Sequence, residues 1–146
     1  MKLPLLPLLT ATTIAVAVAS PAHAASPVLI GKTQYDSPGS DSRTQASLNA
    51  EYVTIKNTST TVRSLTGWTL RDASAHVFTF PAFNLAAGRS VIIHTGTGTN
   101  NASNLYWRSG NYVWNNPGDT ATLKNSAGTT VDSCRWTTTA PGYTNC

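Results

Sequence analysis

Apolar and polar residues alternate in short runs over most of this chain. Beyond about residue 25, apolar side chains recur at every second position within a run, and Thr, Ser, Asn and Gly separate the runs. The three- and four-residue spacing of an amphipathic helix is absent there, and period-two runs are typical of strands with one buried face. The pattern predicts seven strands, at residues 28–33, 51–56, 62–71, 77–80, 90–94, 120–124 and 131–136. Strands that recur roughly every ten residues predict an all-β sandwich or barrel.

The same alternation predicts the hydrophobic core. Val53 and Ile55 share one face of their strand, and the residues between and beside them share the other. The predicted core consists of Val53, Ile55, Trp68, Leu70, Phe78, Phe80, Val91, Ile93, Ala121 and Leu123. Leu65 has the wrong parity to join Trp68, so either it faces the opposite layer or a bulge near Gly67 shifts the register by one residue.

Turn residues connect the predicted strands. Asn-Pro-Gly-Asp at residues 116–119 places Pro and Gly as a type II turn requires. Residues 125–128 are expected to form the hairpin loop between the last two strands. Two longer polar loops occupy residues 37–46 and 95–104, and the second consists almost wholly of Gly, Thr, Asn and Ser. A loop of that length is often functional or mobile.

Residues 1–24 differ from the rest and read as a signal peptide. A single Lys precedes an apolar run that two prolines interrupt, and Ala-His-Ala at residues 22–24 supplies small residues at both cleavage positions. Since a spanning helix needs about 20 apolar residues with flanking anchors, we expect cleavage before Ala25 and no transmembrane segment in the mature chain. The predicted location is secreted, either free or attached to the cell surface. An uncleaved membrane anchor is the alternative.

The mature chain has the size of one domain. About 120 residues remain after the signal, which we divide into a sandwich at residues 25–136 and a tail at residues 137–146. Nine Lys and Arg against six acids give it a formal charge of nine minus six, or +3. The cations are scattered singly, whereas basic arms that bind nucleic acid cluster them. This distribution favours solvated faces.

Cys134 and Cys146 are the only cysteines, and we expect them to form a disulfide. An exported chain meets an oxidising compartment, and an even number of cysteines favours pairing. The alternative, a pair of zinc thiolates, lacks further ligands, because His76 and His94 lie far away in the sequence without paired spacing. No metal or other cofactor is predicted.

A series of motifs in a fixed order resembles a known family. It includes Gly67-Trp68 within residues 65–72 and Trp114 within residues 113–116. The full series covers residues 49–57, 65–72, 78–81, 85–88, 91–96, 106–107, 113–116 and 118–123. Together they resemble the lamin tail domain, an immunoglobulin-like β-sandwich, and indicate a free-standing, secreted bacterial member of the actinobacterial type.

This resemblance implies a binding role. Lamin tail domains serve as adhesion or adaptor modules, with protein or nucleic-acid contacts in lamins and attachment to exported nucleases or surface proteins in bacteria. The resemblance also places Asp72 and Asp119 in turns, where an Asp side chain commonly bonds its own backbone. Gly67 and Trp68 are then folding residues.

The residue inventory argues against a hydrolase. Glu51 is the only glutamate, and no Gly-x-Ser-x-Gly nucleophile elbow occurs. His94 has no acidic or second basic partner close in sequence, and the loop at 95–104 contains no carboxylate for calcium. The glycosylation patterns at Asn57 and Asn101 are interpreted as turns. We therefore predict a protein that is not an enzyme.

The candidate partner surface lies in residues 105–114, where aromatic and basic side chains are concentrated. Strand alternation would put Tyr112 and Trp114 on one face. We assign Trp107 and Trp114 to packing, which leaves Tyr106, Arg108 and Tyr112 as candidates for exposure and contact, because Tyr and Arg supply much of the contact energy in interfaces.

The sequence thus predicts a secreted, non-catalytic interaction or adhesion module at the cell surface or envelope. An extracellular nucleic-acid-binding module and a carbohydrate-binding module are the alternatives. The partner's identity stays open, with an envelope protein or a polysaccharide favoured over nucleic acid.

Overall fold

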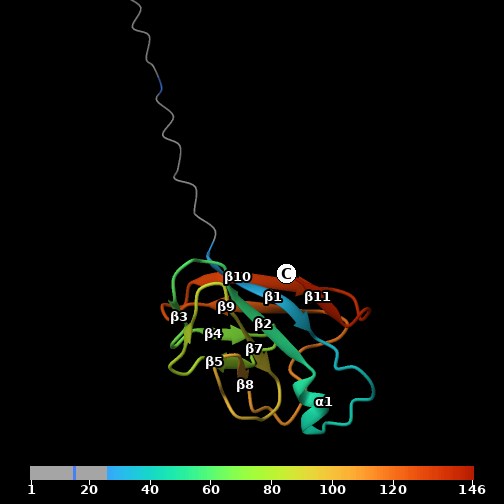
Figure 1. Cartoon of the computed structure of the whole chain (residues 1–146). Coiled ribbons are helices and arrows are strands. Elements are labelled where there is room, and N and C mark those ends of the chain that lie inside the picture. The colour runs from blue at the N-terminus through green and yellow to red at the C-terminus, as the bar shows by residue number, and fades with distance from the viewer. Residues whose placement is uncertain (1–14, 16–25) are drawn as a thin grey trace, which may run out of the picture.

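The computed structural model describes Ala15 and residues 26–146 (Figure 1). Apart from Ala15, the predicted signal peptide and its cleavage site lie outside the described residues.

Two antiparallel-rich sheets pack face to face, as the labels in Figure 1 show. The first has the order β11-β1-β2-β7-β8, and all its strands pair antiparallel except β7 and β8, which are parallel. The strands of this sheet are β1 Val28–Gln34, β2 Tyr52–Asn57, β7 Ser90–His94, β8 Asn104–Tyr106 and β11 Tyr143–Asn145.

The second sheet is wholly antiparallel, with the order β10-β9-β4-β5. Its strands are β4 Thr69–Arg71, β5 Val77–Thr79, β9 Asp119–Lys124 and β10 Thr130–Trp136. A small ribbon pairs β3 Arg63–Ser64 with β6 Asn84–Leu85, and α1 spans Gln45–Asn49. The all-β sandwich predicted from alternation is confirmed.

The predicted strand at 62–71 is wrong, because the chain turns in its middle. Gly67 has φ 74°, and the Trp68 amide donates to the Leu65 carbonyl at 2.9 Å, which closes a turn between β3 and β4. Glycine adopts a positive φ at a lower cost than any other residue. Leu65 is fully buried, whereas Trp68 lies half-buried against the core. The mismatch in alternation between Leu65 and Trp68 therefore reflects a break between two strands.

The other predicted core residues are buried. They form one cluster between the sheets, which also includes Val28, Ile30, Tyr35, Leu85, Leu105 and Trp136. Burial alternates strictly along β2 and β9, as expected for strands with one face toward the core.

One connection differs from expectation and one agrees. Gly118 does not have a positive φ, so the predicted type II turn at 116–119 is wrong. The Asp119 carboxylate organises this turn instead, accepting hydrogen bonds from the Asn115 and Thr120 amides at 3.0 and 2.8 Å. The hairpin at 125–128 is confirmed, with Gly128 at φ 83°.

Four short elements were not predicted, and one of them is β6 of the small ribbon. Within the loop at 37–46 the chain begins α1, where the Thr44 side chain accepts a hydrogen bond from the Ser47 amide as N-cap. β8 lies at the end of the Gly-Thr-Asn loop, and β11 adds residues 143–145 of the tail to the edge of β1. None of these elements carries two large apolar side chains on one face, as the predicted strands at 77–80 and 90–94 do.

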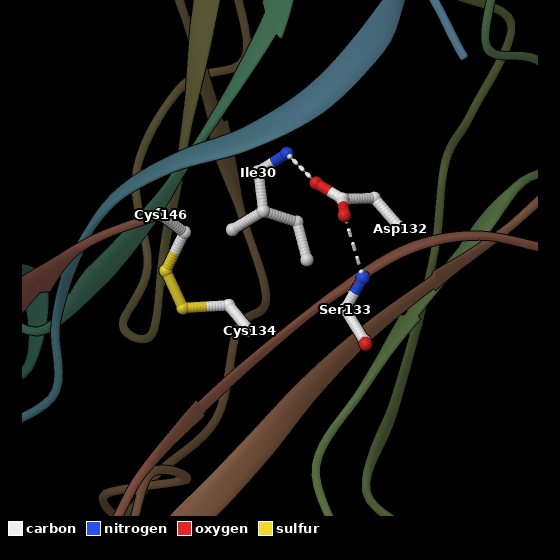
Figure 2. The surroundings of a disulfide bond; sticks show 5 residues. All are labelled: Ile30, Asp132, Ser133, Cys134 and Cys146. Atoms are coloured by element: carbon white, nitrogen blue, oxygen red, sulfur yellow. Dashed lines mark hydrogen bonds between the residues drawn. A yellow bond between two sulfur atoms is a disulfide. The ribbon is translucent and has the colours of Figure 1, made fainter. Parts of the chain in front are cut away.

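A disulfide and a carboxylate join the two sheets on one side of the sandwich. Cys134 in β10 is bonded to Cys146, just beyond β11, with Cα atoms 5.8 Å apart. Beside this bond the Asp132 carboxylate accepts hydrogen bonds from the Ile30 amide at 2.8 Å and the Ser133 amide at 2.9 Å (Figure 2). Both strands shift register near this point. The predicted disulfide is thus present.

Candidate functional site

Tyr106 packs between a histidine and the Gly-Thr-Asn loop. Its ring stacks on His94 with centroids 5.0 Å apart and planes 18° apart. On Gly98, a Cβ atom would overlap the Tyr106 ring, so the loop backbone lies directly against it. The half-buried Tyr106 therefore fixes the loop to the end of β7.

His94 holds α1 and the same loop together. Its Nδ1 lies 2.8 Å from the Asn49 carbonyl oxygen at the end of α1, and its Nε2 lies 2.8 Å from Asn104 Oδ1. Gln45 and Asn49 of α1 also bond the backbone of Thr97 at 2.8 and 2.9 Å. Both ring nitrogens are engaged, which gives His94 a structural role.

Arg108 and Tyr112 lie on either side of a tight backbone segment. The exposed Arg108 has φ 65°, a region that non-glycine residues rarely adopt. Its amide donates to the Gly96 carbonyl at 2.9 Å. The Tyr112 hydroxyl lies 2.6 Å from Ser47 Oγ, on α1. Tyr112 thus contacts α1 directly, whereas Tyr106 and the Arg108 amide contact the loop that α1 bonds through Gln45 and Asn49.

Trp107 and Trp114 pack as predicted. Trp114 is buried, and Trp107 is half-buried against the core, with the two rings at 88° and 5.7 Å. The predicted alternation is wrong, because residues 111–114 form no strand and the consecutive Val113 and Trp114 are both buried.

Glu51 explains this arrangement, and sequence reasoning did not predict its role. Its side chain is buried, and Oε1 accepts hydrogen bonds from Thr95 Oγ1 at 2.7 Å, from the Val113 amide at 2.8 Å and from the Trp114 amide at 3.3 Å. The carboxylate thus ties the segment after Arg108 to the start of β2. Its only signal in the sequence was that the chain contains a single glutamate.

Burial governs the ionisation of Glu51. Desolvation raises the pKa of this carboxyl from 4.5 to about 7, against the hydrogen bonds from Thr95, Val113 and Trp114, which lower it. The negative charge of Asp41 raises the pKa further. Asp41, Glu51 and Tyr112 line a cavity of about 250 Å³. A second pocket, of about 480 Å³, lies beside the 95–104 loop and is lined in part by Phe83.

One comparison identifies the architecture. The family model described as Lamin Tail Domain matches residues 21–138, more than half of the chain. The chain belongs to the lamin tail domain family. This is a family of immunoglobulin-like, non-enzymatic domains. No curated protein matches the chain.

Asp72 and Asp119 of this lamin tail domain bond the backbone. Asp72 Oδ1 accepts from the Ser74 and His76 amides at 3.0 and 2.8 Å, and Asp119 Oδ1 accepts from the Ala73 amide at 2.9 Å. Both are buried. Asp72 lies in the turn between β4 and β5, as the resemblance implied, whereas Asp119 is the first residue of β9 and bonds the turn before it. Across residues 26–146 no three acidic, His or Cys side chains are placed to hold a metal ion.

Of the helical residues that the structure describes, none belongs to a helix of sufficient length and apolarity to cross a bilayer.

Proposed function

We propose that this lamin tail domain is a secreted, non-catalytic module that adheres to a partner at the cell surface or envelope. The contact region is Tyr106, Arg108 and Tyr112, at α1 and the loop at 95–104. The family's interaction role supports the general function. The signal-like residues 1–24 and the disulfide support secretion, since disulfides persist in oxidising compartments.

The backbone conformation of Arg108 is the main observation that supports this contact region. The exposed Arg108 is held at φ 65° by backbone hydrogen bonds on both sides of it. The Trp107 amide donates to the His94 carbonyl oxygen at 2.8 Å, and the Ser109 amide donates to the Thr95 carbonyl oxygen at 2.9 Å. A non-glycine residue in this region costs on the order of 1–3 kcal/mol and persists where the surroundings determine it. A cation presented on a rigid backbone binds without the cost of ordering that backbone.

The non-catalytic character rests on how the polar groups are used. Glu51, Asp72, Asp119 and Asp132 each accept backbone hydrogen bonds, and both nitrogens of His94 are engaged. Groups committed in this way hold turns and segments in place. They offer no ready base or nucleophile.

The test is a triple substitution, Tyr106→Ser, Arg108→Ser and Tyr112→Ser, compared with the parent for binding to envelope preparations. The expected result is at least a tenfold loss of binding at a temperature where both proteins are folded, since a few Tyr and Arg residues carry most contact energy. The matched control is Tyr143→Ser with Arg63→Ser, which removes exposed side chains elsewhere. Unfolding of the triple variant, or equal binding by all three proteins, contradicts the proposal.

Secretion has a separate test. Intact-mass analysis of culture supernatant is expected to find a chain that begins at Ala25 and carries the disulfide. Recovery of the full 146-residue chain in the membrane fraction contradicts the signal peptide and the location.

A further inference from the structure

The outer face of the four-stranded sheet has an unusual composition. Arg71 in β4, Lys124 in β9 and Arg135 in β10 point away from the core, since they alternate with the buried Leu70, Leu123 and Cys134. The hydroxyl residues on the same face are Thr69, Thr79, Thr120, Thr122, Thr130 and Ser133. Neither a carboxylate nor an aromatic ring occupies an outward position on these four strands.

The strand register places each cation among hydroxyl groups. Arg71 lies opposite Thr122, and Arg135 lies opposite Thr120. Lys124 lies opposite Thr69 in one neighbouring strand. Arg71 and Lys124 are diagonal neighbours, about 7–8 Å apart at Cα. Cations and hydroxyls therefore alternate over most of this face, whose strands lie about 4.8 Å apart. The exposed Val77 of β5 lies opposite Arg71 at the edge of the face.

These cations have no acidic partners. Within residues 26–146 the only ion pair joins His76 to Asp72, and Arg71 Nε is buried without a hydrogen-bond partner. The nearest acids are turned away from this face: Asp72, after β4, and Asp119, at the start of β9, are buried and bond turn amides, and Asp132 is directed to the β1 backbone. Unpaired cations on a face without acids produce a positive local potential.

We propose that this face binds a linear anionic polysaccharide. Arg71, Lys124 and Arg135 contact the carboxylate or sulfate groups, and the threonine hydroxyls exchange hydrogen bonds with the sugar hydroxyls. Nucleic acid fits less well, because single strands bind through aromatic side chains that stack on bases, and the face has none. The surface is separate from Tyr106, Arg108 and Tyr112, so the inference goes beyond the proposed function. With both surfaces, the domain connects a polymer to a second partner.

The test measures binding to polygalacturonate, heparin, neutral dextran and single-stranded DNA over a series of salt concentrations. Both anionic polysaccharides are expected to bind, dextran is not, and affinity falls as salt rises because counterions are released. The variant Arg71→Gln/Lys124→Gln/Arg135→Gln keeps much of each aliphatic stem. It is expected to bind at least tenfold more weakly, with the salt slope reduced by about one for each cation removed.

The matched control removes the same charge from the other layer, as Lys32→Gln/Lys56→Gln/Arg89→Gln, all at exposed positions. Wild-type-like binding by this control supports the site. Equal losses in both variants, or DNA bound more tightly than polygalacturonate, overturn the proposal. If the Arg71 variant does not fold, Lys124→Gln/Arg135→Gln replaces it, with a thermal melt as the check. The Tyr106/Arg108/Tyr112 triple variant is expected to retain polysaccharide binding, so the two proposals fail independently.

Discussion

The two open sides of this sandwich are closed in different ways. Beside β1, β10 and β11 the sheets are joined by the Cys134–Cys146 disulfide and by the Asp132 bond to the Ile30 amide (Figure 2). Beside β5 and β8 the two sheets are joined by aromatic packing: the ring centroids of Phe78, in β5, and Trp107, just after β8, lie 5.8 Å apart.

The difference follows from what lies next to each side. The bonded side carries β11, a strand of three residues that pairs with β1 and is joined to β10 through the disulfide just beyond it. The aromatic side adjoins the segment that carries Arg108 and Tyr112, which Glu51 holds through Val113 and Trp114. Stability on the second side and presentation of the candidate contact region therefore depend on the same packing.

The largest effect is expected from Phe78→Ala, which opens the aromatic side. Phe78 is buried and its ring contacts both Phe80 and Trp107. Removing such a ring leaves a cavity and lowers the free energy of unfolding by roughly 3–5 kcal/mol. Denaturant unfolding measures this, with the half-buried Phe83→Ala as a milder control. A loss below about 1 kcal/mol contradicts aromatic closure.

Glu51 is expected to make stability on this side depend on pH. Below pH 4.5 it is protonated in both states; between 4.5 and about 7 the unfolded chain loses the proton while the folded chain keeps it. The unfolded state then binds fewer protons, so the free energy of unfolding falls as pH rises, by about 3 kcal/mol in all.

The check is the difference in stability between the parent and Glu51→Gln from pH 4 to 8. The Gln carbonyl oxygen can accept the hydrogen bonds that Oε1 accepts, but it does not titrate. The free energy of unfolding of Glu51→Gln should therefore lack the fall between pH 4.5 and about 7. Asp41→Asn should move the transition to lower pH, because Asp41 raises the pKa of Glu51. Parallel pH profiles for parent and Glu51→Gln contradict the interpretation.

Removing the disulfide is expected to lower the free energy of unfolding somewhat less than Phe78→Ala does. Cys146→Ser removes a cross-link that closes a 12-residue separation, and should lower the free energy of unfolding by roughly 2–4 kcal/mol. Reduced parent protein should show the same loss. Alkylation without prior reduction provides the second measurement: labelling of both thiols in the native protein shows that the bond is absent.

The smallest effect concerns Asp132. Asp132→Ala leaves the Ile30 and Ser133 amides without their acceptor, and we expect a loss of about 1–2 kcal/mol. Asp132→Asn, which retains one acceptor oxygen, should lose less. If both variants are as stable as the parent, the hydrogen bonds of the Asp132 carboxylate do not contribute to joining the sheets.

Much of the fold could be predicted because its strands obey one local rule. Alternation identified the buried faces of β2 and β9, and Leu65 with Gly67 revealed the break before β4. β8 and β11 have three residues each and no period to detect.

The candidate site was less accessible to sequence reasoning. Tyr106, Arg108 and Tyr112 were identified by composition, but their arrangement at α1 and the 95–104 loop depends on a helix of five residues. Glu51 contacts a backbone amide 62 residues away. Contacts of that separation exist only once the sheets have formed, so no local pattern shows them.

The proposed contact region is tested most directly by one substitution, Arg108→Gly, measured for melting temperature and for binding to envelope preparations. Glycine accepts φ 65° without strain, so the melting temperature should stay equal or rise, while binding falls at least tenfold because the presented cation is gone. Ala75→Gly, at φ 73° in another turn, controls for relief of backbone strain, and it should bind like the parent. Undiminished binding by Arg108→Gly would contradict the account.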